Sequence, residues 1–472
     1  MSQPLPGIEH VVLLMFENRS FDNVLGAFYA ATTKPDGGGV PSGWSNPGPG
    51  SSKVAAWQAP AGSKAQTIPF PDPQESFLHM TSQITTTPPM MGFVKDYATV
   101  EGADPKDIMQ YYIDANVPVT HALATTYAVS DLYFASGPVQ TWPNRLFSLC
   151  GTPAYDVEHG TPYLNNDEYP DYPLMIGQID SSNFPSIFDQ IHNAGLSWKV
   201  YYGDEAPIAA LLSTVWDNWD PFLDDGKAVY LDRFYHDVRH DKLPAFSLIE
   251  PRYQMLGLGI EAPTSNHPGD SLAVGDSDIP INISCGERLL AQVFNALAAN
   301  PTLFAKTLLV VTYDEHGGLF DHVTPPKATS PFPSGAVKGF NYDRYGVRVP
   351  ALFINPRVQR AQKGSPVGIF RPPSSNTPFD HTSLLATLQG QFKLPGKPLT
   401  RRSAAAPTFA GLVDPGYPAI PTKTISLPKC HWPAFGAEMQ HAAPVLLSGF
   451  ARAQRLGALR SKSRRLKALR KL

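Results

Sequence analysis

Two of the most apolar runs in the chain end at side chains that could bind a metal ion. Glu17 and Asn18 follow the first run, and Asp314 and Glu315 follow a later one. Carboxylates that are brought together repel one another, so such a group needs a cation to neutralise it. Oxygen ligands without a thiolate suit a hard or borderline divalent ion. These four residues therefore predict a divalent metal site, and zinc, calcium, magnesium and manganese all stay open as its occupant.

A threonine at a predicted turn could supply a nucleophile. Thr141 stands where the chain enters a helical pattern that begins at Asn144 and ends before Gly151. A free alcohol is a poor nucleophile near neutral pH, whereas coordination to a metal ion lowers its pKa. The amide of Asn144 and the N–H groups of a helix N-terminus could then hold phosphoryl oxygens. This arrangement predicts phosphoryl transfer, with Thr141 as nucleophile and as metal ligand.

Several histidines could bind phosphate or protonate a leaving oxygen. We expect these roles for His79 and for His267, which follows a predicted strand that ends at Glu250. Taken singly, each imidazole could instead be structural. Three further histidines lie in equally suggestive contexts, and only geometry can rank them: His316, His322 and His381.

Strands and helices alternate along the chain, and these elements must position the polar residues. Apolar runs predict strands at 11–16, 128–133, 198–202, 246–249, 307–313 and 347–355. Helical spacing predicts helices at 119–128, 144–149, 186–193, 286–299 and 380–388. This alternation is typical of an αβα sandwich with a mostly parallel central sheet. The carboxyl ends of parallel strands meet at one edge, where open α/β sheets bind their ligands.

The composition fits a globular protein with long ordered loops. The chain has 472 residues, 42% of them hydrophobic, and can bury one large core or two smaller ones. A stretch rich in Gly, Pro and Ser at 32–73 predicts a long irregular loop over a site. No apolar run approaches the length of about 18 residues that a transmembrane helix needs, and no signal peptide precedes the first strand. We therefore expect a cytoplasmic protein, or one exported by a signal-independent route.

The end of the chain differs in charge from the rest. Residues 451–472 hold nine Lys and Arg and no acidic residue, whereas the whole chain has a net charge of −3. Leucines near helical spacing make this segment a candidate basic amphipathic helix. We divide the chain into a catalytic domain over 1–450 and this tail. The tail favours peripheral contact with a membrane or partner over specific nucleic-acid binding, although a merely solvated tail is an equal alternative.

The three cysteines stand far apart in the sequence and form no CxxC motif. Cys150, Cys285 and Cys430 therefore predict neither a disulfide framework nor a thiolate zinc site. We expect them to be reduced or buried.

Five motifs stand in the chain in the order IEHVVLLMFENRSFDNVLG, TWPNR, TYDEHGGLFDHVTPP, YGVRVPALFINP and FDHTSLLATL. Together they resemble the bacterial phosphoesterase family, which contains phospholipases C and metal-dependent acid phosphatases and looks like a branch of the alkaline phosphatase superfamily. The resemblance implies an αβα sandwich, one catalytic metal and a covalent phospho-hydroxyl intermediate. It implies a nucleophile at Thr141 and a phosphate contact at His267, with His79 carried over on weaker flanking sequence. The metal ligands it implies are Glu17, Asn18, Asp314 and Glu315.

The resemblance implies a phospholipase C that acts on phospholipid, with a broad-specificity acid phosphatase acting on small phosphate esters as the nearest alternative. The aromatic content and the basic tail favour lipid. A formylglycine sulfatase is disfavoured because Thr141 replaces the Cys or Ser of its motif. A non-catalytic module that binds a membrane or partner is the alternative from another class. The joint presence of the carboxylates and Thr141 argues against it.

Overall fold

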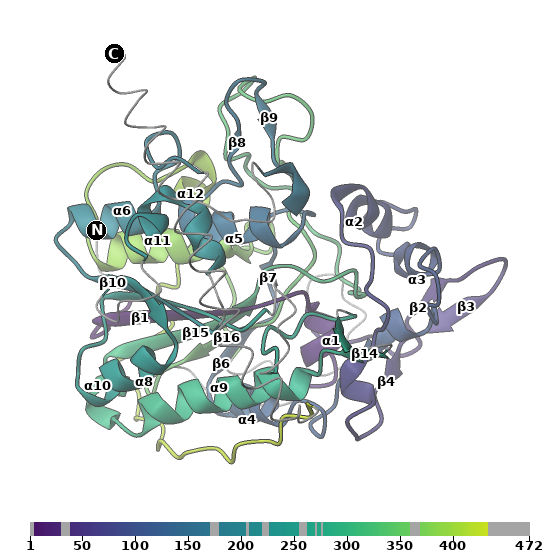
Figure 1. Ribbon diagram of the computed structural model, residues 1–472, viewed down its shortest axis with the longest axis horizontal. Coiled ribbons are helices and arrows are strands. Elements are labelled where there is room, and N and C mark those ends of the chain that lie inside the picture. Colours follow the sequence, from purple (N-terminus) through teal and green to yellow (C-terminus); the bar gives the residue numbers. More distant parts are fainter. Residues whose placement is uncertain are drawn as a thin grey trace.

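A seven-stranded sheet forms the centre of the protein (Figure 1). The computed structural model describes residues 4–29, 38–169, 179–203, 207–219, 226–253, 262–269, 271–274, 277–358 and 369–432. In spatial order the strands are β11 (Ala228–Tyr230), β10 (Trp198–Tyr202), β12 (Phe246–Glu250), β1 (His10–Phe16), β15 (Thr307–Tyr313), β16 (Ala351–Ile354) and β6 (Ala128–Ser130). Only β16 runs antiparallel to its neighbours in this sheet. The predicted mostly parallel sheet is confirmed.

The two most apolar strands, β1 and β15, lie side by side at the centre of the sheet. Every residue of β15 is buried, and so is every residue of β1 after His10. Strands that are covered on both faces have this continuous apolar character. Their parallel register pairs Phe16 with Tyr313, the last residue of each strand. The polar residues that follow the two strands therefore begin next to each other.

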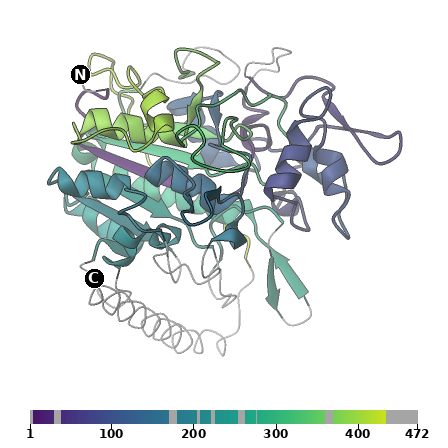
Figure 2. The same ribbon diagram turned by 90° about the horizontal axis from the view of Figure 1, so that it is seen from above.

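Two layers of helices cover the sheet (Figures 1 and 2). One face carries α5 (Thr141–Cys150), α6 (Ile187–Asn193), α11 (His381–Gln391) and α12 (Arg401–Ala405). The other carries α4 (Pro118–Thr126), α8 (Asp232–Arg239), α9 (Ile283–Ala298) and α10 (Pro301–Ala305). Two shorter helices are α1 (Phe21–Leu25), which follows β1, and α7 (Ser213–Trp216). These layers confirm the αβα sandwich and the five predicted helices, with ends that differ by a few residues.

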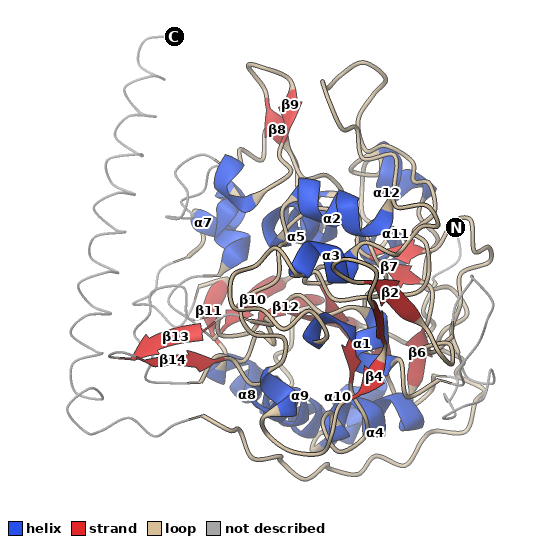
Figure 3. Ribbon diagram, turned by 90° about the vertical axis from the view of Figure 1, so that its right-hand side faces the viewer, coloured by secondary structure: helices blue, strands red, loops and turns tan. Residues whose placement is uncertain are grey.

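A lobe at the carboxyl end of the strands covers the edge where the polar residues gather (Figure 3). It holds α2 (Phe77–Ile84), α3 (Phe93–Tyr97), β2 (Ser45–Pro47), β3 (Lys53–Ala55), β4 (Trp57–Gln58) and β5 (Gln110–Tyr111). The prediction of one irregular loop over 32–73 was thus wrong in part. Strands of two or three residues are too short for apolar alternation to reveal them. Three further ribbons pair β7 (Tyr133–Phe134) with β17 (Phe379–Asp380), β8 (Tyr155–Asp156) with β9 (Thr161–Pro162), and β13 (Ser271–Val274) with β14 (Ser277–Pro280).

The last described segment runs along α9 and is bonded to it covalently. Cys285 in α9 forms a disulfide with Cys430, which corrects the expectation that these cysteines are reduced. Cys150 is buried and free, as expected. Asn295 accepts a hydrogen bond from the Ile425 N–H and donates one to the Ile425 carbonyl oxygen, both at 2.8 Å. The pairing escaped prediction because 145 positions separate the two cysteines and only the path of this segment brings them together.

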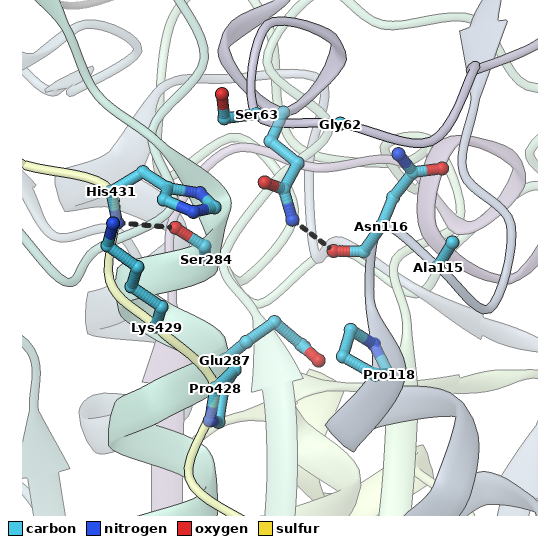
Figure 4. Close-up of a pocket in the computed structure, with 11 residues that line it drawn as sticks. Gly62, Ser63, Ala115, Asn116, Pro118, Ser284, Glu287, Pro428, Lys429 and His431 are labelled. Atoms are coloured by element: carbon cyan, nitrogen blue, oxygen red, sulfur yellow. Dashed lines mark hydrogen bonds between the residues drawn. The ribbon is translucent and has the colours of Figure 1, made fainter.

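A small pocket lies where this segment meets the starts of α4 and α9 (Figure 4). Its volume is about 170 Å³, and Glu287, Asn116 and Lys429 are among its lining residues. The Glu287 carboxylate accepts the N–H of Val119 at 2.6 Å and therefore stabilises the N-terminus of α4. None of the predicted site residues lines this pocket.

The predicted basic tail at 451–472 lies outside the described residues. Within the described part of the chain, no helix is long and apolar enough to cross a membrane.

Candidate active site

The ends of β1 and β15 are joined by hydrogen bonds through the Asp314 carboxylate. Its Oδ1 accepts the backbone N–H of Asn18 at 3.0 Å and that of Glu315 at 2.8 Å. Asn18 has φ of 59°, a left-handed conformation that few residues other than glycine adopt. Such strained backbone persists where surrounding contacts hold it, which is common at functional sites. Hydrogen bonds from two backbone N–H groups to the Asp314 side chain therefore hold three of the predicted metal ligands close together.

Thr141 reaches the same place from α5. It is the first residue of the helix and is 4% exposed. Its hydroxyl donates to Asn18 Oδ1 at 3.3 Å, so the proposed nucleophile lies beside a proposed metal ligand. Gly151 ends the helix with φ of 73°, as the sequence pattern predicts. The structure thus brings together Thr141 and Asn18, which stand 123 positions apart.

The N-terminus of α5 offers a phosphate fewer donors than expected. The Trp142 N–H donates to Asn166 Oδ1 at 2.8 Å, and Pro143 has no N–H. Asn144 uses its amide to shape the preceding turn: it donates to the Val139 carbonyl oxygen at 2.6 Å and accepts the Gly137 N–H at 3.1 Å. In this structure Asn144 therefore holds the turn that presents Thr141 and does not face the phosphate position.

Arg145 is a site residue that the sequence reasoning missed. Its Nε–H donates to Asp314 Oδ2 at 2.9 Å, and a terminal nitrogen donates to the carbonyl oxygens of Met15 and Phe16 at 3.2 Å each. The guanidinium is 3% exposed. A buried carboxylate needs such a partner, so Arg145 ties α5 to the ends of both central strands. Its place in the TWPNR motif was the available signal.

The loop after β12 brings His267 to the other side of Asn18. The Glu17 N–H donates to the Ser265 carbonyl oxygen at 2.8 Å, and Arg19 Nε–H donates to the Asn266 carbonyl oxygen at 2.8 Å. His267 Nδ1 lies 2.9 Å from the Pro268 carbonyl oxygen, and its Nε2 lies 3.0 Å from Asn18 Nδ2. Because the carbonyl only accepts, Nδ1 carries a proton, and Nε2 is the nitrogen that faces the site.

Glu75 is a second residue that sequence reasoning missed. Its Oε1 accepts Asn18 Nδ2–H at 2.7 Å and lies 3.6 Å from His267 Nε2. This contact turns the Asn18 oxygen toward Thr141 and its NH₂ toward Glu75. Burial alone would lower the pKa of His267, but the charges of Glu75 and Asp72 outweigh burial and raise that pKa well above its usual value. No periodic pattern surrounds Glu75, so the sequence held no signal for it.

The loop that carries His267 depends on a glycine in α9. Asn266 has φ of 74°, and a Cβ added at Gly286 would lie 1.8 Å from Asn266 Oδ1. We expect Gly286→Ala to displace this loop and lower kcat by about 10²-fold, because a shift of about 1 Å at a catalytic group can cost that much. Turnover of a soluble phosphate ester is the measurement, with circular dichroism as the check on folding. Unchanged turnover would show that the His267 position is unimportant.

Glu250 does not join the proposed metal ligands. Its carboxylate accepts the N–H groups of Ile208 and Ala209 at 2.6 and 2.9 Å and stabilises the turn that they begin. Glu250, which ends the strand before His267, therefore has a structural role.

The four other candidate histidines divide into one that is partly exposed and three that are buried. His79 lies on α2 with its side chain 36% exposed, and no measured contact joins it to Thr141. Burial lowers the pKa of His316 to about 3 and that of His381 to about 4, so both are neutral near pH 7. His381 Nε2–H donates to the Asp314 carbonyl oxygen at 2.6 Å. His322 pairs with Asp22 at 2.6 Å in a buried cluster that also holds Arg348.

The chemistry of the donor set fits a divalent cation beside Thr141. Glu315 Oε2 accepts the Gly317 N–H at 2.6 Å, whereas its Oε1 is buried with no hydrogen-bond partner among the described residues. Burial, together with the negative charges of Glu75 and Asp314, raises the pKa of Glu315 well above its usual value. An orphaned carboxylate oxygen amid like charges is what a bound cation would relieve.

Among the described residues, two groups of acidic and histidine side chains have convergent ligand atoms, and one of these groups borders Asn18 in the candidate site. Each group has its ligand atoms within 4.8 Å of one another: Asp22, Asp321 and His322 form one, and Asp72, Glu75 and His267 form the other. Arg348 donates to both acids of the first group and already neutralises it. The Asn18 NH₂ donates into the second group. Acids of both groups therefore already accept a hydrogen bond from a neighbouring side chain.

Removal of divalent ions is expected to abolish turnover. We expect exhaustive dialysis against EDTA to lower kcat by at least ~10²-fold, because the Thr141 hydroxyl loses the cation that lowers its pKa. Activity should return on titration with one of zinc, calcium, magnesium or manganese. Full activity in metal-free buffer, with metal content checked by mass spectrometry, would contradict the assignment of a metal site.

Comparison with known proteins identifies the family of this chain. The model of the Phosphoesterase family matches residues 8–395. Non-specific phospholipase C6 of Arabidopsis thaliana is 32% identical over 86% of this chain and 72% of its own length. Phospholipase C B of Mycobacterium tuberculosis is 28% identical over 89% of this chain and 81% of its own. A solved protein of the alkaline phosphatase superfamily from Vibrio parahaemolyticus is 14% identical, with a TM-score of 0.33, over 62% of this chain and 64% of its own. The chain belongs to the Phosphoesterase family and is a phosphoric ester hydrolase.

Proposed function

We propose that this protein is a phospholipase C that works through a phosphothreonine at Thr141. The observation that carries the proposal is the hydroxyl of Thr141 at the first turn of α5, 3.3 Å from Oδ1 of Asn18, whose backbone N–H is bonded to the Asp314 carboxylate. The names of the relatives, non-specific phospholipase C6 and phospholipase C B, support phospholipid as the substrate. The products would be diacylglycerol and the phosphorylated head group.

The reaction would proceed in two displacements at phosphorus. Thr141 Oγ1 would release its proton to solvent and attack phosphorus, and the bond from phosphorus to the glycerol oxygen would break. Water would then attack the phosphothreonine, and one of its protons would pass to Oγ1 as the bond from phosphorus to Oγ1 breaks and the head-group phosphate leaves. Glu17, Asn18, Asp314 and Glu315 would hold a divalent cation, whose charge would favour the alkoxide and the phosphoryl oxygens.

One histidine would contact the phosphate, and another would protonate the leaving oxygen. His267 Nε2 faces the site beside Asn18 and is held in place by the Pro268 carbonyl oxygen. We assign it contact with the phosphate. His79 would protonate the glycerol oxygen as the bond breaks, because a departing alkoxide needs a proton.

Comparison of three substrates tests the proposed specificity. We expect turnover of phosphatidylcholine vesicles and of p-nitrophenylphosphorylcholine to exceed turnover of p-nitrophenyl phosphate. The reverse order would identify a phosphomonoesterase that uses the same residues. No turnover of any of the three, with metal supplied, would favour the non-catalytic alternative.

An exposed leucine next to His79 supports contact with a lipid surface. Leu78 on α2 is 75% exposed, the largest exposed fraction among the exposed large hydrophobic side chains of the described residues. We expect Leu78→Ser to lower turnover of phosphatidylcholine vesicles about fivefold relative to turnover of p-nitrophenylphosphorylcholine, because ~1 kcal/mol of apolar transfer free energy is lost.

A matched control is Leu427→Ser. Leu427 is 44% exposed and stands between Ile425 and Pro428, which both accept hydrogen bonds from α9. Helix α9 lies on the other side of the sheet from α2 (Figure 1). We expect this variant to leave the ratio of the two turnover rates unchanged. Equal effects of both substitutions would remove the support that Leu78 gives to membrane contact through α2.

A further inference from the structure

A chain of hydrogen bonds runs from His79 to the residue next to Glu315. His79 Nδ1 lies 2.7 Å from Asp96 Oδ1, and Gln83 Nε2–H donates to Asp96 Oδ2 at 2.8 Å. Gln83 Oε1 lies 2.8 Å from His316 Nε2. The chain thus joins α2, α3 and the loop after β15. Asp96 and Gln83 are buried.

The carboxylate of Asp96 determines the direction of every bond in the chain. An ionised carboxylate only accepts, so His79 Nδ1 must carry a proton and Gln83 must present its NH₂ to Asp96. The Gln83 oxygen then faces His316, whose Nε2 must carry a proton in turn. This leaves Nε2 of His79 as the nitrogen available to a substrate.

Close packing holds the residues of this hydrogen-bond chain in place. A Cβ at Gly92, the residue before α3, would lie 2.3 Å from the Ser82 carbonyl oxygen, so a glycine lets α3 close on α2. Phe93 packs edge-on against the His316 ring with centroids 6.0 Å apart. Gln83 also donates to the Gln74 carbonyl oxygen at 3.1 Å, next to Glu75. These hydrogen bonds therefore connect with the neighbours of two site residues, His316 beside Glu315 and Gln74 beside Glu75.

We propose that Asp96 and Gln83 are positioning residues for the phosphoester hydrolysis: Asp96 orients His79 toward the substrate, and Gln83 fixes His316 and with it the neighbouring Glu315. The proposal rests on the proposed function through the role of His79. It assigns the two residues separable effects, because Asp96 acts on the leaving oxygen and Gln83 acts on the metal-binding loop.

A double-mutant cycle tests the Asp96 branch. We expect Asp96→Asn to lower kcat for p-nitrophenylphosphorylcholine by about 10- to 100-fold, the usual effect of a residue that orients a catalytic group. In a His79→Ala background the same substitution should change kcat less than about threefold, because its target is gone. An equal loss in both backgrounds would overturn the role of Asp96. Ser82→Ala is the control, since its hydroxyl also donates to Asp96 Oδ1, at 3.2 Å, and kcat should stay within about threefold.

Thermal shift on metal titration tests the Gln83 branch without activity. We expect Gln83→Leu to raise about tenfold the concentration of zinc, calcium, magnesium or manganese that gives half of the stabilisation. His79→Ala should leave that concentration unchanged. An unaltered metal midpoint in Gln83→Leu, with its metal-free Tm near that of the wild type, would overturn this branch. Failure of the proposed function would appear differently, as full activity of Thr141→Ala.

Discussion

Thr141→Ala is expected to lower kcat by about 10³-fold or more on every phosphate ester that the protein hydrolyses. The alanine lacks the oxygen that would form the bond to phosphorus, and no other hydroxyl is hydrogen-bonded to Asn18 Oδ1 among the described residues. A loss of this size corresponds to ~4 kcal/mol of transition-state stabilisation. The Tm should change little, because the backbone of α5 is unaffected and alanine favours a helix.

Thr141→Ser is the matched control for the nucleophile. Serine keeps the hydroxyl at the same position of α5, so we expect it to retain a measurable fraction of wild-type kcat. Rapid quenching with labelled substrate should trap a phosphorylated protein in the wild type and in Thr141→Ser but not in Thr141→Ala. Normal turnover by Thr141→Ala would show that another group attacks phosphorus.

Gly317→Ala is expected to inactivate the site, because Gly317 packs closely against Asn18. Gly317 has φ of 62°, and a Cβ there would lie 2.3 Å from the Asn18 carbonyl oxygen and 2.9 Å from Asn18 Cβ. Both neighbours belong to the strained turn that presents a proposed metal ligand, so neither can move without moving that ligand. We expect kcat to fall by at least ~10²-fold and metal affinity to fall with it, measured by turnover and by thermal shift.

Gly335→Ala is the control that separates a steric clash from the free-energy cost of a left-handed backbone conformation. Gly335 has φ of 74°, but a Cβ there would meet no atom within 4 Å. This variant should lose only the ~1 kcal/mol that a left-handed conformation costs a residue with a side chain, and its kcat should match the wild type. If Gly317→Ala behaved in the same way, close packing against Asn18 would have no functional role.

Much of the fold was predictable because its signals are local. The continuous apolar runs of β1 and β15 identify strands covered on both faces, and the bounds of β15 were predicted to the residue. Short strands in the lobe were missed because two or three residues show no periodicity. The disulfide was missed because the residues around Cys285 in the sequence give no indication that it pairs with Cys430.

The candidate site was predictable where a side chain directly follows a strand or begins a helix. Asn18, Asp314, Glu315 and Thr141 meet because β1 and β15 are parallel neighbours and α5 starts over their ends. The role assigned to Asn144 changed because its side-chain amide forms hydrogen bonds within the turn that includes Gly137. The predicted roles of these residues in catalysis stay predictions until the variants are measured.

By itself the sequence determined the αβα architecture, the oxygen-bearing side chains at the strand ends and the threonine at the entry to a helix, since each depends on residues within one element. Only the tertiary structure decided that Arg145 neutralises Asp314, that Glu75 turns the amide of Asn18, and that Asp96 orients His79. These are hydrogen bonds between buried polar groups that come from separate loops. A buried polar group must find a partner somewhere, but its own sequence neighbourhood does not say which one.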